Sequence, residues 1–192
     1  MASVGSKVVT AVSNAARTLG QTLDKIGASI EVAKYTERLV PSTRFVSVDG
    51  IAPVVSEAAA FVAPSANVIG DVTIGKDSSI WYGATVRGDG HRVTIGSNTS
   101  IGDRALIHIA TLQSNNPTTI GSNVTVGPAA MIHAATLKDN CIIGPMAQVL
   151  DGAIVGERSV LGAGAVLGMG KEIPDGEWWG GCPARKVREL SL

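Results

Sequence analysis

The sequence predicts an all-β solenoid, a parallel β-helix of hexapeptide repeats, flanked by an N-terminal amphipathic helix and a short C-terminal helix. From residue 60 onward, an aliphatic side chain recurs every six residues, and the residue two positions before it is small or β-branched. Glycine often follows the aliphatic residue, where a turn is needed. Residues i and i−2 of a strand share a face, so each hexad directs one large and one small side chain inward. Stacked repeats of this kind are typical of a solenoid with three short strands per coil.

The hexad pattern holds at seventeen aliphatic positions. Longer steps after Val86 and Ile107 predict surface loops at residues 88–92 and 110–117. Three hexads per coil predict about six coils, and the β-helix is assigned to residues 46–172. The aliphatic positions are Val62, Val68, Ile74, Ile80, Val86, Ile95, Ile101, Ile107, Ile120, Val126, Ile132, Leu137, Ile143, Val149, Val155, Leu161 and Leu167.

Residues 1–45 differ in composition and are predicted to form a helical arm. No acidic residue precedes Asp24, whereas Lys7, Arg17 and several serines do. This composition is typical of a mitochondrial targeting segment, and a helix that packs across the main domain is an equally open and compatible alternative. An amphipathic helix over residues 5–38 is predicted because one helical face collects Val8, Val12, Leu19, Leu23, Ile26 and Ile30.

Residues 173–192 follow the last hexad and are predicted to form a turn and a capping helix. Pro174 and Gly176 indicate the turn. The helix is predicted from Pro183 to Leu190, since proline is favoured in the first turn of a helix. A cap is expected because the last coil of a solenoid otherwise exposes its core.

The composition excludes several classes of protein. Sixteen Lys and Arg residues balance sixteen Asp and Glu residues, which argues against nucleic-acid binding. Two cysteines, Cys141 and Cys182, rule out a disulfide scaffold and fit a reducing compartment. No apolar stretch approaches the roughly 18 residues of a membrane span.

Counting three faces per coil brings two histidines together on the exterior. We expect His108 and His133 to be neighbours one coil apart, near the spacing of about 4.8 Å between adjacent strands. Such a pair could bind a metal ion, or it could pack as neutral rings at an interface. His91 lies in a predicted loop and is expected to be solvated. The full outward column is Ile69, Arg87, His108, His133, Leu150 and Gly168.

Residues 60–186 resemble the gamma-class carbonic anhydrases. The hexad also resembles that of left-handed parallel β-helices, which implies a left-handed solenoid, whereas general connection rules favour the right-handed sense. The arm and the tail resemble the mitochondrial branch of plants and algae, whose members form heterotrimers on the matrix side of respiratory complex I. The matching stretches are Arg87-Gly88-Asp89, Ile101-Gly102-Asp103, Ile107-His108, Val124-Thr125-Val126-Gly127, Ile132-His133, Leu150-Asp151-Gly152, Trp179-Gly180-Gly181 and Pro183-Ala184-Arg185.

The resemblance implies a zinc site shared between subunits. In the family, three histidines bind zinc at each interface, two from one chain and one from its neighbour. His108 and His133 match the first pair. The neighbour's ligand belongs five residues before His133, where this chain has Pro128, and proline has no side-chain ligand atom.

Residues around the implied site depart from the family pattern in part. The family's Asn and Gln are replaced by Ser100 and Gly102, whereas Asp103 is kept as a candidate remnant of the catalytic machinery. The face count places Asp103 and Pro128 one coil apart. Arg87 and Asp89 are expected to pair at the trimer interface and to support assembly, the alternative being a solvated pair.

These features predict a structural or assembly subunit of the gamma carbonic anhydrase heterotrimer of mitochondrial complex I, inactive by itself. No zinc is expected in a homotrimer, and zinc is expected only at a hetero-interface that combines His108 and His133 with a partner's histidine. The expected partners are other gamma carbonic anhydrase subunits and, through the N-terminal helix, membrane-arm subunits. The expected location is peripheral, on the matrix side of the inner membrane. A hexapeptide-repeat acyltransferase is the other alternative, because such enzymes also use an interface histidine as a base.

Overall fold

The computed structural model describes residues 12–13, 15–16, 18–23, 26–27, 44–59, 61–109 and 117–191. The chain divides into two compact units, Met1–Val40 and Pro41–Leu192. In the first unit, every described residue is helical, as predicted for this stretch. The predicted ends of this helix, with Val8 and Ile30, lie outside the described residues. No helix among the described residues is long and apolar enough to cross a membrane.

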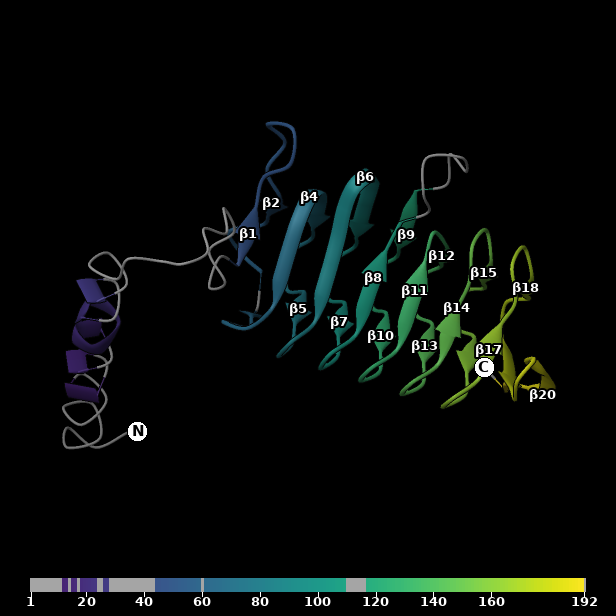
Figure 1. The fold of residues 1–192 in the computed structure, drawn as a ribbon. Coiled ribbons are helices and arrows are strands. Elements are labelled where there is room, and N and C mark those ends of the chain that lie inside the picture. Colours follow the sequence, from purple (N-terminus) through teal and green to yellow (C-terminus); the bar gives the residue numbers. More distant parts are fainter. Residues whose placement is uncertain are drawn as a thin grey trace. The chain divides into compact units, whose positions relative to one another are not determined.

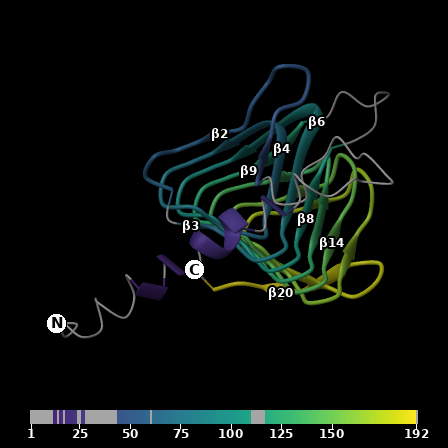
Figure 2. The ribbon, with the colours of Figure 1, turned by 60° about the vertical axis from the view of Figure 1, so that its left-hand side comes forward.

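The second unit is a left-handed parallel β-helix (Figure 1). Viewed closer to its axis, its coils stack with three sides (Figure 2). Its described strands are β1 (Phe45–Val46), β2 (Val54–Val55), β3 (Phe61–Val62), β4 (Asn67–Ile74), β5 (Ser79–Ile80), β6 (Thr85–Ile95), β7 (Ser100–Ile101), β8 (Leu106–His108), β9 (Thr118–Ile120), β10 (Thr125–Val126), β11 (Met131–His133), β12 (Thr136–Leu137), β13 (Ile142–Ile143), β14 (Gln148–Val149), β15 (Ile154–Val155), β16 (Val160–Leu161), β17 (Val166–Leu167), β18 (Glu172–Ile173), β19 (Glu177–Gly180) and β20 (Arg185–Glu189).

Three faces make up each coil. Face A stacks β3, β5, β7, β10, β13, β16 and β19, and face B stacks the first halves of β4 and β6 with β8, β11, β14 and β17. Face C stacks β2, the second halves of β4 and β6, β9, β12, β15 and β18. Seven described strands on face A correspond to about seven coils, one more than predicted, because the repeat continues beyond Leu167 to Ile173 and Trp179.

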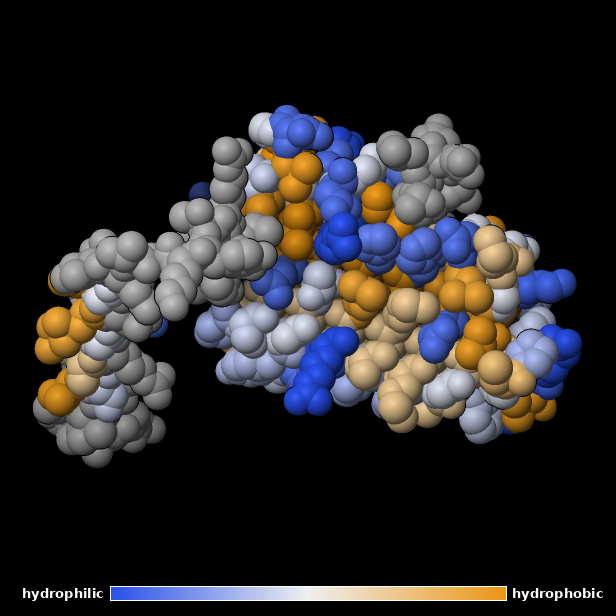
Figure 3. Space-filling view, in the orientation of Figure 1, coloured by the Kyte–Doolittle hydropathy of each residue, from blue (hydrophilic) through white to orange (hydrophobic). Residues whose placement is uncertain are grey.

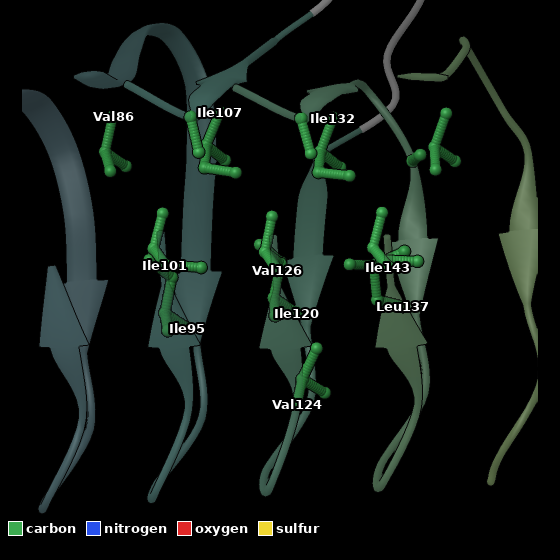
Figure 4. Packing of buried hydrophobic residues seen from close by; sticks show 14 of the residues in the cluster. Val86, Ile95, Ile101, Ile107, Ile120, Val124, Val126, Ile132, Leu137 and Ile143 are labelled. Atoms are coloured by element: carbon green, nitrogen blue, oxygen red, sulfur yellow. The ribbon is translucent and has the colours of Figure 1, made fainter. Parts of the chain in front are cut away.

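The core is a stack of aliphatic side chains, one layer per coil. Figure 4 shows Ile107 beside Ile132, and Ile101 beside Val126 and Ile143, in the interior of the solenoid. Sixteen of the seventeen predicted aliphatic positions are buried. The exception is Val62, which is half-buried because β3 is the terminal strand of face A and pairs only with β5.

Polar residues at the small inward positions are accommodated by hydrogen bonds. Ser78, Thr99, Thr118 and Ser159 are buried at the small-residue positions of the hexad. The hydroxyl of Ser78 donates to the carbonyl of Gly96 at 2.7 Å, and that of Thr99 donates to the carbonyl of Gly121 at 2.8 Å. These bonds join adjacent coils and satisfy groups that burial would otherwise penalise.

The corner between faces C and A requires a left-handed residue in each coil. Asparagine and aspartate tolerate positive φ better than most residues, which explains their recurrence at this corner. The side-chain amide of Asn98 also donates to the side-chain oxygen of Asn123 at 2.8 Å, which joins two adjacent coils at this corner. The corner residues with positive φ are Asp77, Asn98, Asn123, Asn140, Arg158 and Gly176.

Residues 88–92 form part of strand β6, so the predicted loop there is wrong. β6 runs from face B around the corner to face C, and the neighbouring strand β4 makes the same turn. Arg92 donates through Nε to both carboxylate oxygens of Asp71 on β4, at 3.0 and 3.2 Å. Of the second predicted loop, residues 110–116 lie outside the described residues.

The predicted C-terminal helix is also wrong, because residues 185–189 form strand β20. This strand pairs antiparallel with β19 and closes the end of face A. Lys186 donates to Glu177 at 2.7 Å, and the guanidinium of Arg188 lies 5.3 Å from the ring centroid of Trp178. An antiparallel strand satisfies the backbone groups along the open edge of β19, which a helix would leave unpaired.

Candidate functional site

Face B brings a row of polar side chains together on the exterior of the solenoid. Strand alternation buries Ile107 in β8 and Ile132 in β11, and therefore directs His108 and His133 outward. The two histidines are paired in register, with ring centroids 5.1 Å apart and planes inclined by 36°. The prediction that they share a face one coil apart is confirmed. On this side, Figure 3 shows a row of hydrophilic side chains crossing the strands, with hydrophobic side chains beside it.

The surroundings of His108 lower its pKa on balance. Burial lowers the pKa of His108, and the positive charge of Arg87 and the neighbouring ring of His133 lower it further, against an opposing contribution from Asp89. The Nε2 atom of His108 is buried and has no hydrogen-bond partner within the described ranges. A neutral ring of this kind can offer a lone pair to a metal ion or a proton donor.

His133 lies against a carboxylate that the sequence analysis did not identify as a site residue. Its Nδ1 atom is 3.0 Å from Oδ1 of Asp151, and about a quarter of each side chain is exposed. The contact is a close approach of the two atoms and does not have the geometry of a hydrogen bond. The available signal was that Asp151 directly follows Leu150 of the same outward column.

Arg87 continues the row one coil before His108. Its Nη2 and Nε atoms donate to the same oxygen of Asp89, at 2.5 and 3.2 Å. Burial raises the pKa of the Asp89 carboxyl, but the hydrogen bond and the charge of Arg87 outweigh this effect and hold the pKa below its usual value. The two residues therefore pair within one chain, and their placement at a trimer interface stays a prediction.

Replacing Arg87 tests that placement. If the pair supports assembly, Arg87→Ala should weaken the trimer and shift sedimentation towards smaller species on dilution, since it removes a directional contact and leaves Asp89 without its partner. Arg92→Ala is the matched control, because Arg92 also pairs with an aspartate but lies around the corner. Equal sedimentation of the wild type and both variants would show that Arg87 is only a solvated partner of Asp89.

Asp103 and Pro128 stack one coil apart, as the face count predicted. The amide of Ala129 donates to the carbonyl of Asp103 at 2.8 Å. Asp103 and Pro128 line a surface pocket together with Tyr82. Oδ1 of Asp103 accepts a hydrogen bond of 3.0 Å from the backbone amide of Tyr82. Asp103 therefore stabilises the corner between faces A and B.

Gly102 lies where adjacent coils approach closely in this chain. A Cβ atom added there would lie 2.8 Å from the backbone nitrogen of Pro128 and from the carbonyl oxygen of Val126. A larger residue would push the two coils apart. Packing between the coils thus favours glycine at this position, which lacks the side-chain amide of the family's Gln.

The described residues of one chain do not form a complete metal site. Three or more His, Cys, Asp or Glu side chains are nowhere grouped closely enough to hold a metal ion in the described part of the chain. His108 and His133 supply two imidazoles, and Pro128 supplies no ligand atom.

His91 was expected to be solvated, and this expectation is wrong. It is half-buried in β6, and its Nε2 atom is buried with no hydrogen-bond partner among the residues described. It lines a pocket at the corner of faces B and C with Asp71, Asp89 and Arg92. Nothing in the geometry joins it to the histidine pair.

The fold and the repeat define a hexapeptide-repeat protein of the left-handed β-helix class. A family model described as "Bacterial transferase hexapeptide (six repeats)" matches residues 134–168. A hexapeptide transferase family protein from Anaplasma phagocytophilum has a similar structure, with a TM-score of 0.72 and 39% identity over 77% of this chain and 84% of that one. A putative acetyltransferase from Bacillus cereus has a TM-score of 0.73 and 30% identity, with the same coverage.

The curated relatives are more specific. The chain is 44% identical over 179 residues to gamma carbonic anhydrase 1, mitochondrial, of Arabidopsis thaliana, and 41% identical over 195 residues to gamma carbonic anhydrase 2, mitochondrial. These matches cover 91% and 100% of this chain but 65% and 69% of the relatives, so the chain spans about two thirds of their length. A probable carbonic anhydrase of Methanocaldococcus jannaschii is 41% identical over 130 residues, covering 68% of this chain and 80% of that protein. The chain belongs to the gamma carbonic anhydrase family.

Proposed function

We propose that this chain is a structural or assembly subunit of a gamma carbonic anhydrase heterotrimer on the matrix side of mitochondrial complex I. The observation that carries the proposal is the asymmetry of its metal-binding residues. The outward pair His108 and His133 is intact and stacked, whereas Pro128, at the position of the donated ligand, has no ligand atom. A trimer made only of this chain would therefore have no interface with three imidazoles.

A second function is favoured by the state of the histidine pair. The Nε2 atom of His108 is buried without a hydrogen-bond partner among the described residues, and the ring of His133 lies next to it. In a mixed trimer, this pair would join the bridging histidine of a neighbour, and the chain would contribute half of an active zinc site. When bound, zinc would lower the pKa of a coordinated water to about 7 and so supply hydroxide for carbon dioxide hydration.

The alternative of acyl transfer rests on weaker support. Two solved structures with the same fold are described as members of a transferase family or as a putative acetyltransferase. The residues that such an enzyme would use as a base are the same histidines that match the gamma carbonic anhydrases. Transfer of an acyl group from coenzyme A by the purified chain would favour this alternative.

The arm supports the proposed attachment to the membrane complex. Its described apolar side chains Val12, Leu19 and Leu23 are exposed. Their spacing places them on one face of the helix, as in helices that bind a partner surface or a membrane interface. We infer mitochondrial location from the same arm composition and from the mitochondrial relatives. The exposed residues are Val12, Leu19, Leu23 and Ile26.

Native gels of mitochondria test the attachment. The full chain should comigrate with complex I, and deletion of residues 1–40 should leave a trimer that no longer joins it. The double variant Leu19→Asp with Leu23→Asp should act like the deletion, because both residues are exposed on the apolar face. Gln21→Asp adds a charge to an exposed position of the same helix and should comigrate normally. Normal incorporation of the deleted chain would contradict the proposed role of the arm.

A further inference from the structure

The contact between Asp151 and His133 has a chemical consequence for the histidine pair. A neutral imidazole carries one proton, and the partner of one ring nitrogen decides which nitrogen holds it. Oδ1 of Asp151 lies 3.0 Å from Nδ1 of His133. A carboxylate is only an acceptor, so this neighbour favours a proton on Nδ1 and leaves the lone pair on Nε2.

The backbone positions Asp151 for this contact. The amide of Gly152 donates to the carbonyl of Ala134 at 2.8 Å, which ties the turn of Asp151 to the residue after His133. The carbonyl of Asp151 accepts the amide of Gly170 from the next coil at 2.9 Å. The turn is thus held between two coils, and its carboxylate lies beside the ring of His133.

Among the described residues, the carboxylate of Asp151 is not paired with a basic side chain. No lysine or arginine forms an ion pair with Asp151 in the ranges that the structure describes, and its carboxylate there lies against Nδ1 of His133. Asp89 and Asp71 differ, because each is paired with an arginine of the same strand or the neighbouring one. Along this row, the carboxylate next to the histidines is therefore the one that no guanidinium neutralises.

We propose that Asp151 is a positioning residue that holds His133 in the Nδ1–H tautomer and presents its Nε2 lone pair at the subunit boundary. The inference rests on the proposed function of the histidine pair as the chain's contribution to a shared site. Nε2 of His133 then offers a lone pair beside the ring of His108, as a divalent metal ion shared at a hybrid interface requires.

Nuclear magnetic resonance of the ring nitrogens tests the tautomer directly. The full chain, labelled with ¹⁵N-histidine, is measured at a pH where the imidazoles are neutral. His133 should show the Nδ1–H pattern in the wild type and should shift towards Nε2–H in Asp151→Ala. Asp151→Glu should restore at least part of the wild-type pattern, because it returns a carboxylate. Glu172→Gln, at an exposed position on face C, is the control and should leave His133 unchanged.

Two outcomes would overturn the proposal. One is that His133 of the wild type has the Nε2–H form. The other is that the Asp151→Ala variant is folded, as its thermal midpoint shows, and His133 keeps the wild-type tautomer. A merely structural role of Asp151 would alter stability without moving the tautomer. The tautomer is measured without a partner subunit, so its result is separate from the assembly with complex I and from zinc at a hybrid interface.

Discussion

Purified alone, the chain is expected to bind well under one zinc ion per subunit interface and to hydrate carbon dioxide no faster than the uncatalysed background. The reason is that two imidazoles leave half of a tetrahedral zinc shell without protein ligands. Pro128→His should raise the zinc content towards one ion per interface, since it adds an imidazole at the position that the family uses. Metal analysis of the dialysed trimer measures both values.

The control for this experiment adds a histidine nearby. Thr125→His places an imidazole at an exposed position of β10, three residues before Pro128 in the same coil, and should leave the zinc content low. Mixing the native chain with a subunit that has the full set of histidines should create zinc sites wherever that subunit donates the bridging histidine, and none where Pro128 takes that place. Stoichiometric zinc and rapid hydration by the native homotrimer would contradict the structural role. A hybrid interface without zinc would exclude the half-site function, and only the scaffold role would remain.

Truncation of a core isoleucine should cost about 2–5 kcal/mol in the free energy of unfolding. Ile143 is buried in the stack of face A, and Ile143→Ala would leave a cavity between two coils whose backbones are joined by hydrogen bonds. The coils cannot collapse into this cavity without breaking that register. Denaturant unfolding at a fixed subunit concentration measures the loss.

The preceding residue is a matched control for the same truncation. Ile142 lies on the same strand but points outward and is 47% exposed. Ile142→Ala should change the free energy of unfolding by about 0.5 kcal/mol or less. If the two variants lost equal stability, face A would be covered by another subunit at this point and the single-chain burial would not describe the assembled protein.

The sequence alone determined the architecture of the solenoid and the position of the histidine pair. Inward and outward directions alternate along each strand, and the hexad advances one face at a time, so counting along the chain was enough to stack His108 on His133. The same count placed Asp103 beside Pro128. These results depend on local periodicity, which a single sequence contains in full.

In two other segments, only the tertiary structure decided which secondary structure forms. Residues 88–92 were predicted as a loop because they break the hexad, yet pairing with β4 carries strand β6 around the corner. The tail was predicted as a helix from its proline, yet the open edge of β19 makes it a strand.

Asp151 shows the same limit at the site. The face count places its neighbour Leu150 beside His133 but does not say where the Asp151 carboxylate points, and the stacking of one coil on the next brings that carboxylate to 3.0 Å from the ring. Periodicity in a sequence specifies which face a side chain occupies. The contacts between coils, which depend on backbone pairing over long separations, decide what that side chain meets.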